Sequence, residues 1–299
     1  MKRSIKAYLY LALKGFAMGA AEAIPGVSGG TIAFVTGIYE ELILNITKLR
    51  FGLVTTLRIQ GLGAFWKQAN GPFFTALLAG MAVSFITVLK TAKWLIANHP
   101  ILIWSFFFGL ILGSTVLVGK ALSKWRWSTV MVLLFGTFLA FFLTNLPPRE
   151  EELSDWFLIF AGAIAISAMI LPGISGAYIL VILGAYDKLG QAVDDLDIKK
   201  LLLFGSGLII GLLSFSRILK WLFAHYRNTV LALLTGFILG SLYKIWPWRI
   251  QTIESKWLTE IAVWPTKFPE EAHSIQALVW MLAGLGIIIA LESIQNKII

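Results

Sequence analysis

Long apolar blocks dominate this sequence and restrict the kinds of structure it can form. Residues 73–89, 101–118 and 129–146 each approach the roughly twenty residues that a helix needs to cross a bilayer. Strands of an outer-membrane barrel instead alternate apolar and polar residues over about ten positions. With 58% hydrophobic and only 14% charged residues, the chain could not clothe a water-exposed globule either. The sequence therefore predicts an all-α integral membrane protein.

A duplicated segment organises the rest of the chain. Residues 23–42 read AIPGVSGGTIAFVTGIYEEL and residues 170–189 read ILPGISGAYILVILGAYDKL, which match without a gap at an offset of 147. Later matches, such as 93–95 with 220–222, have an offset of 127, because the first half has a longer loop. We therefore expect one fold duplicated, with repeat 1 at 1–147 and repeat 2 at 148–299.

Each copy contains a segment that cannot continue a helix. In 25–30 and in 172–176, proline lacks the amide hydrogen and the glycines loosen the backbone. The apolar arms on either side are short for a full crossing, so we expect two re-entrant hairpins, at 7–46 and 156–191. Non-helical backbone at membrane depth is tolerated where it is buried in protein or lines a wet cavity. The two tips are therefore expected to face a binding site.

Six full crossings complete the predicted topology. Three lie between the hairpins, at 73–97, 101–122 and 127–146, and three follow, at 201–222, 229–246 and 274–293. Because three is odd, the second hairpin would enter from the opposite face, which gives the inverted repeats of many secondary transporters. The stretch 248–264 is predicted to be an amphipathic surface helix, and 48–68 either such a helix or a loop.

Charge placement predicts the orientation. The N-terminal side would hold 15 of the 25 Lys and Arg residues and four acidic residues, whereas the other side would hold 10 basic and 12 acidic residues. By the positive-inside rule, both termini are cytoplasmic. The net charge of +9 is therefore attributed to cytoplasmic loops rich in Lys and Arg, and no nucleic-acid partner is expected.

Ser28 and Ser175 stand where the helix after each break should begin, and serine is a favoured N-cap. Unpaired amides and the positive end of the helix dipole would then point toward the bilayer centre, which suits an anion. The alternative is that the small residues serve only helix packing. The expected binding residues are Ser28, Gly29, Gly30 and Thr31 at the first tip and Ser175, Gly176, Ala177 and Tyr178 at the second.

Three charged residues lie within apolar segments. Lys90 and Arg217 occupy the same repeat position and would either assist the anion or extend their side chains to the interface. Glu22 precedes the first tip, and its repeat counterpart is Met169. Its carboxyl group would either carry a proton that couples transport or be an inert group satisfied by neighbouring amides and a cation. With no cysteine and three scattered histidines, neither a metal nor another cofactor is expected.

The segments AEAIPGVSGGT (21–31) with GIYE (37–40), and LPGISG (171–176) with GAY (184–186), resemble the PopT-type polyprenyl-phosphate translocases, a family long known only as a domain of unknown function. The resemblance covers essentially the whole chain. It implies a translocase (flippase) that returns undecaprenyl phosphate from the outer to the inner leaflet of a bacterial plasma membrane, for cell-wall synthesis. The lipid partner comes from the resemblance, since the residues alone indicate only an anion transporter. A homo-oligomer is left open.

Two other functions stay open at this point. Intramembrane undecaprenyl-diphosphate phosphatases also use inverted re-entrant hairpins with Pro-Gly-x-Ser tips, but their chemistry needs an arginine beside the tip serine and paired glutamates. Here Gly-Gly and Gly-Ala follow the two serines, and Glu22 stands alone. A phosphoryl-transfer site without a cation would lack its main electrostatic stabilisation, so we expect no enzyme. The second alternative is a transporter of a small soluble anion.

Overall fold

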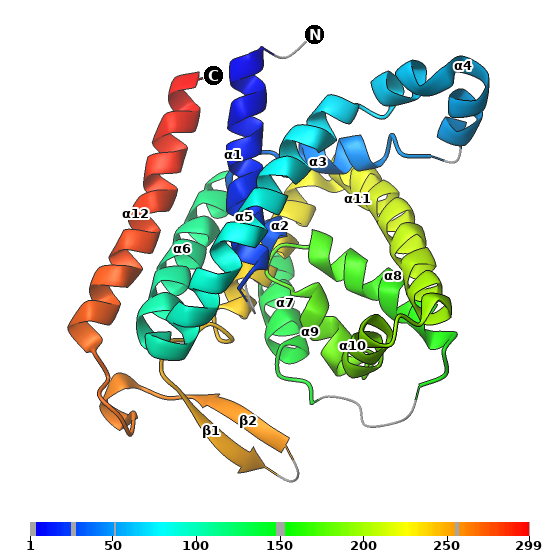
Figure 1. Cartoon of the computed structure of the whole chain (residues 1–299). Helices are drawn as coiled ribbons and strands as arrows, with labels where there is room; N and C mark the ends of the chain where they lie inside the picture. The colour runs from blue at the N-terminus through cyan, green and yellow to red at the C-terminus, as the bar shows by residue number, and fades with distance from the viewer. Residues whose placement is uncertain (1–3, 25–27, 51, 148–152, 255–256, 299) are drawn as a thin grey trace. The chain divides into compact units, whose positions relative to one another are not determined.

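The computed structural model is helical almost throughout (Figure 1) and describes residues 4–24, 28–50, 52–147, 153–254 and 257–298. The helices of the first half are α1 (Ile5–Glu22), α2 (Gly29–Val35), α3 (Tyr39–Ile46), α4 (Gly52–Gln68), α5 (Gly71–Asn98), α6 (Pro100–Lys120) and α7 (Trp127–Leu143). Those of the second half are α8 (Phe157–Ile170), α9 (Gly176–Ile182), α10 (Tyr186–Asp194), α11 (Ile198–Ser241) and α12 (Ser274–Ile298). Among the described residues, four helices are long and apolar enough to cross a membrane, namely α5, α6, α11 and α12. The chain is thus a largely helical membrane protein, as predicted.

The predicted crossings differ from the observed helices in two places. The segment predicted at 127–146 forms α7, which ends at Leu143 and whose 17 residues are at the short end of the range for a full crossing. The segments predicted at 201–222 and 229–246 correspond to the two parts of α11, which are separated by a non-helical backbone at Tyr226 (φ −133°, ψ 37°), and the second part ends at Ser241. Because residues 223–228 contain neither proline nor glycine, the chain kinks there instead of forming a loop.

The stretch 248–264 is not a helix, so that prediction is wrong. Residues Arg249–Glu254 (β1) and Trp257–Ala262 (β2) form a two-stranded antiparallel sheet, with Arg249 opposite Ala262. Its sequence is rich in β-branched isoleucine and threonine, which favour strands. A short 3₁₀ helix, η1 (Pro265–Lys267), follows. In contrast, most of 48–68 is helical as α4, which is interrupted at Gly61 (φ 79°).

The chain forms two compact units, and each takes parts from both halves of the sequence. One unit comprises Met1–Leu89 with Pro148–Arg227, and the other comprises Lys90–Pro147 with Asn228–Ile299. The first unit therefore contains both tip segments, α1–α3 and α8–α10. In this unit, the buried residues Leu158, Ala161 and Ala165 of α8 form one hydrophobic cluster with Leu180 of α9 and Ala185, the N-cap of α10.

Glycines at equivalent positions allow the helices of each unit to pack closely. A Cβ atom on Gly15 of α1 would overlap the carbonyl group of Leu77 on α5, and one on Gly80 would overlap that of Ala12. Small residues generally permit such close approach in membrane bundles. The corresponding contacts of the second half are Gly162 with Phe204 and Gly207 with Ile159, and the second unit pairs Gly136 with Leu233 and Gly284 with Phe106. The packing is therefore duplicated together with the sequence.

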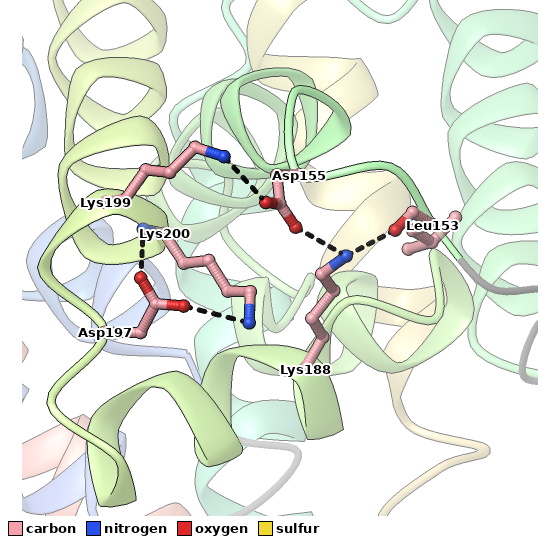
Figure 2. A network of polar contacts seen from close by, with 6 residues as sticks. All are labelled: Leu153, Asp155, Lys188, Asp197, Lys199 and Lys200. Carbon is pink, nitrogen blue, oxygen red and sulfur yellow. Dashed lines mark hydrogen bonds and ion pairs between the residues drawn. The ribbon is translucent and has the colours of Figure 1, made fainter.

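An ion-pair network joins the segment before α8 to α10 and α11 (Figure 2). The carboxylate of Asp155 contacts Lys188 Nζ at 2.9 Å and Lys199 Nζ at 3.2 Å. Next to it, Asp197 contacts Lys200 Nζ at 3.0 Å. The hydrogen bonds from the two lysines hold the pKa of Asp155 below its ordinary value of 3.8. Each lysine of this network is therefore paired with a carboxylate.

Candidate functional site

The first tip joins α1 to α2. The proline and glycine predicted to break the helix, at 25 and 26, lie outside the described residues. Ser28 follows as the N-cap of α2, with extended backbone angles (φ −109°, ψ 129°). Its Oγ accepts a hydrogen bond from the Gly30 amide at 3.2 Å. The predicted N-cap is therefore confirmed.

The second tip repeats this arrangement. After α8 ends at Ile170, Leu171 is extended and Gly173 has a φ of 83°, a conformation that glycine adopts without strain. Ser175 is the N-cap of α9, and its Oγ accepts from the Tyr178 amide at 3.4 Å. The predicted break and N-cap are both confirmed here.

The two tips contact each other within the first compact unit. The Gly173 amide donates to Thr31 Oγ1 at 2.9 Å, and Ser28 Oγ donates to the Leu171 carbonyl at 3.4 Å. A Cβ atom on Gly30 would lie 2.7 Å from the carbonyl oxygen of Ile170. Thr31 is fully buried. The structure thus packs the predicted residues of the first tip against residues 170–173, which lie just before the predicted set Ser175–Tyr178, and a shared site of the two sets stays a prediction.

Two charged side chains of α1 flank the short helix α2. Glu22 Oε1 accepts from the Gly29 amide at 2.8 Å, at the positive end of the helix dipole. Lys14 Nζ donates to the carbonyl of Thr36, which is the C-cap at the negative end. Eight residues of a helix rise about 12 Å, which is close to the length of α2. This spacing of opposite charges is the signal by which Lys14, absent from the predicted site, could have been found.

The second tip lacks both charges. At the positions equivalent to Lys14 and Glu22, it has Ala161 and Met169. Its helix dipole is therefore not neutralised by side chains of α8, and the two halves of the candidate site differ in electrostatics although their backbones match.

The two tips also differ in accessibility. Ser28, Gly29, Gly30 and Thr31 are buried, and the Gly29 and Gly30 amides are engaged by Glu22 and Ser28. At the second tip, Ala177 is exposed and Tyr178 is half-buried. Within the part of the chain that the structure describes, the amides of Gly176 and Ala177 make no hydrogen bond. Gly176 is buried as well, so the exposed residue Ala177 provides the more accessible donor of the second tip.

Among the described residues, neither Lys90 nor Arg217 forms a hydrogen bond with a tip residue. Arg217 is exposed on α11 and donates to the main-chain carbonyl of Leu49 at 3.2 Å. Lys90 is exposed on α5 and begins the second compact unit. Their assistance to the anion stays a prediction.

Comparison with known proteins finds a matching family model and related transporters. The family model that matches is described as undecaprenyl phosphate translocase-like, and it covers residues 18–261, which include both tips. A polyprenyl-phosphate transporter of Vibrio cholerae serotype O1 is 41% identical over 302 residues, 97% of this chain and 98% of its own length. A polyprenyl-phosphate transporter of Staphylococcus aureus is 28% identical over 254 residues, 79% of this chain and 85% of that protein. No solved structure matches the chain.

Proposed function

The chain belongs to the undecaprenyl phosphate translocase-like family, and on that premise we propose that it moves undecaprenyl phosphate from the outer to the inner leaflet of the bacterial plasma membrane. This step would return the carrier lipid for cell-wall synthesis. The observation that carries the proposal is the 41% identity with a polyprenyl-phosphate transporter over 97% of the chain.

The proposed path uses two re-entrant hairpins of inverted orientation, at 7–46 and 156–191. Two observations support it. Helices α2 and α9 have the same bounds at an offset of 147, each with a serine N-cap, and the glycine contacts of the first half recur in the second. Inversion would follow from three crossings between the hairpins, and the charge distribution favours cytoplasmic termini.

The proposed headgroup site lies where the tips meet, at Ser28–Thr31 and Ser175–Tyr178. Phosphate oxygens accept strong hydrogen bonds from amides at a helix N-terminus, and the Gly176 and Ala177 amides make none among the described residues. At the first tip, the Glu22 carboxylate already holds the Gly29 amide. In this proposal Glu22 occupies the place of the phosphate at that tip and must leave before the phosphate binds there.

Protonation provides a means of release. A neutral carboxyl group forms weaker hydrogen bonds to an amide and does not repel a phosphate. Glu22 would therefore take a proton on the outer side when the lipid enters, and would lose it to the cytoplasm after the lipid leaves. Lys90 and Arg217 would attract the headgroup from the two faces in turn. Transport would thus be coupled to the proton gradient.

Leaflet exchange of a short-chain polyprenyl phosphate in proteoliposomes tests this function. The variant Ala177→Leu should stop exchange, because the new side chain would cover the open amides of the second tip at an exposed position. The control Ala97→Leu, at an exposed position of α5, should not. Glycine variants are poor probes, because a Cβ on Gly176 would lie 2.6 Å from the Ala165 carbonyl oxygen and disturb the packing. Absence of exchange by the wild-type protein would refute the function.

We further propose that the protein is not an enzyme. Ser28 Oγ is engaged with the Gly30 amide and the Leu171 carbonyl, as expected for a helix cap. Among the described residues, no cationic side chain donates a hydrogen bond to Ser28 Oγ. Purified protein should therefore release no phosphate from undecaprenyl diphosphate, and release that disappears in Ser28→Ala would establish phosphatase activity instead.

A further inference from the structure

A basic cavity in the first compact unit shares no residue with the tips. It lies between the end of α3, residues 47–50, the end of α4 with Asn70, and the part of α11 before its kink. Two adjoining hollows of about 440 and 490 Å³ share Thr47, Arg50 and Lys220, and we call them together the basic groove. Its cationic lining residues are Lys48, Arg50, Arg217 and Lys220, and Glu41 is the carboxylate among its described lining residues.

None of these four cations forms an ion pair with a carboxylate of the described residues. Lys48 Nζ donates to Asn45 Oδ1 at 2.8 Å, and Arg217 donates to the Leu49 carbonyl at 3.2 Å, so both are oriented by neutral acceptors. In the described part of the chain, the side chains of Arg50 and Lys220 make no hydrogen bond. Lysine has three donor hydrogens and arginine five, so the groove keeps many donors available for an anion.

A buried polar network holds one wall of the groove. Asn45 is only 2% exposed, and its Oδ1 also accepts from Asn70 Nδ2 at 2.8 Å. Its own Nδ2 donates to the Glu41 carbonyl at 3.0 Å. Asn70 has a φ of 56°, a left-handed conformation that asparagine tolerates better than most residues. The donors therefore stand on an ordered wall and are not scattered surface charges.

The second half of the chain provides a comparison at two lining positions, because the counterparts of Glu41 and Asn70 are Lys188 and Asp197 of the ion-pair network of Figure 2. There, each of the three lysines pairs with one of two carboxylates. The duplicated fold therefore does not require a cation at the position of Lys48, whose counterpart is the carboxylate Asp195. The equivalent pairs are Glu41 with Lys188, Lys48 with Asp195, and Asn70 with Asp197.

We propose that the basic groove is a second phosphate site, which binds the monoester headgroup of a lipid. A phosphate monoester carries close to two negative charges near neutral pH and presents three acceptor oxygens, which suits several converging cations. Leu44 and Trp221 also line the groove and are 46% and 53% exposed, so they offer an apolar surface to a lipid chain. The identity of the lipid as polyprenyl phosphate rests on the proposed function, in which the groove would hold the headgroup on the cytoplasmic side.

Lysine acetylation of the full chain in phosphatidylcholine nanodiscs tests this site. A short-chain polyprenyl phosphate at about ten times its dissociation constant should slow the modification of Lys48 and Lys220 about tenfold. Lys93, the exposed repeat counterpart of Lys220, should react at an unchanged rate. Inorganic phosphate at the same concentration should protect far less. Equal protection by inorganic phosphate would assign the site to soluble phosphate and overturn its assignment to a lipid.

Two variants separate the groove from a general charge effect. Arg50→Gln should raise the lipid concentration needed for half-protection about tenfold, since a charge-assisted hydrogen bond is lost. Arg58→Gln removes the same charge from an exposed position of α4 outside the groove and should leave it unchanged. If the protein transports the lipid but Lys48 and Lys220 are not protected, the proposal of a second phosphate site is wrong and the proposed function is unaffected. Protection without transport would support the groove and refute the proposed function.

Discussion

Replacing Glu22 by glutamine should make the protein bind polyprenyl phosphate more tightly. Glu22 Oε1 accepts from the Gly29 amide at 2.8 Å, so a phosphate that uses this amide must first displace the carboxylate. Glutamine has nearly the same shape and keeps an acceptor oxygen, but it has no charge. The variant should therefore preserve the tip while weakening the internal competitor.

The size of the effect follows from the type of hydrogen bond that is lost. A hydrogen bond to a charged group contributes about 1.5–3 kcal/mol, and one between neutral groups about 0.5–1.5 kcal/mol. The difference, about 1–1.5 kcal/mol, is the part of the displacement cost that Glu22→Gln removes. It corresponds to about a five- to tenfold lower dissociation constant.

The second tip allows the reciprocal test. The Cβ of Met169 lies 3.1 Å from where a Cβ on Gly176 would be, much as Glu22 Cγ lies 3.0 Å from that position on Gly29. Met169→Glu should therefore place a carboxylate beside the Gly176 amide and weaken binding by about the same five- to tenfold. The double variant should bind nearly as the wild type does.

Equilibrium binding of a fluorescent short-chain polyprenyl phosphate to nanodiscs, at alkaline pH, would measure all four proteins. Unchanged affinity in both single variants would show that a carboxylate at either tip does not compete with the phosphate. The headgroup would then have to bind elsewhere than at the tip amides.

Proton coupling through Glu22 predicts that an imposed pH gradient accelerates leaflet exchange by the wild type but not by Glu22→Gln, and equal acceleration of both would leave Glu22 a structural role. Thr31→Val should leave the buried Gly173 amide without its acceptor and cost about 1–3 kcal/mol; the melting temperature in detergent should fall in this variant but not in Thr31→Ser. Because its pKa is lowered from 3.8, Asp155 stabilises the fold above that pH and loses this effect as the pH falls through the lowered value. Acidification below about pH 4 should therefore lower the melting temperature of the wild type more than that of Asp155→Asn, and parallel curves would contradict this.

Sequence reasoning succeeded at the tips because the signals there are local. A serine followed by small residues after a Pro-Gly break predicts an N-cap within one or two positions, and Ser28 and Ser175 are the caps observed. The long apolar helices α5, α6 and α12 were predictable for the same reason, since their composition alone distinguishes them.

It failed where a weak local preference decided the structure. Residues 223–228 contain no strong helix breaker, so the two segments predicted at 201–222 and 229–246 are joined by a kink at Tyr226 and the exact end of each was not predictable. The tryptophans around 248–264 suggested a surface helix, but the isoleucines and threonines between them favour the strands β1 and β2. At 248–264 the local geometry was therefore predicted incorrectly.

Contacts between distant residues required the structure. The bond from Gly173 to Thr31 joins residues 142 positions apart, and no periodicity predicts it. The basic groove likewise combines α11 with residues 47–50, which were expected to be only part of a longer loop. A comparison of charges at equivalent repeat positions would have drawn attention to Lys14 and Lys48, because their counterparts are Ala161 and Asp195.

The duplicated backbone with unequal charges bears on how transport could have a direction. Two halves with the same tip geometry would bind a phosphate equally well from either face, and a ligand shifts an equilibrium only through different affinities for its two states. Unequal tips alone still cannot drive net movement, since the lipid has the same chemistry in both leaflets. A driving force that acts on a titratable group displaced by the phosphate would supply this direction. Glu22 meets this requirement in the proposed mechanism, because it carries a titratable carboxyl group, holds the Gly29 amide and has an uncharged counterpart in Met169.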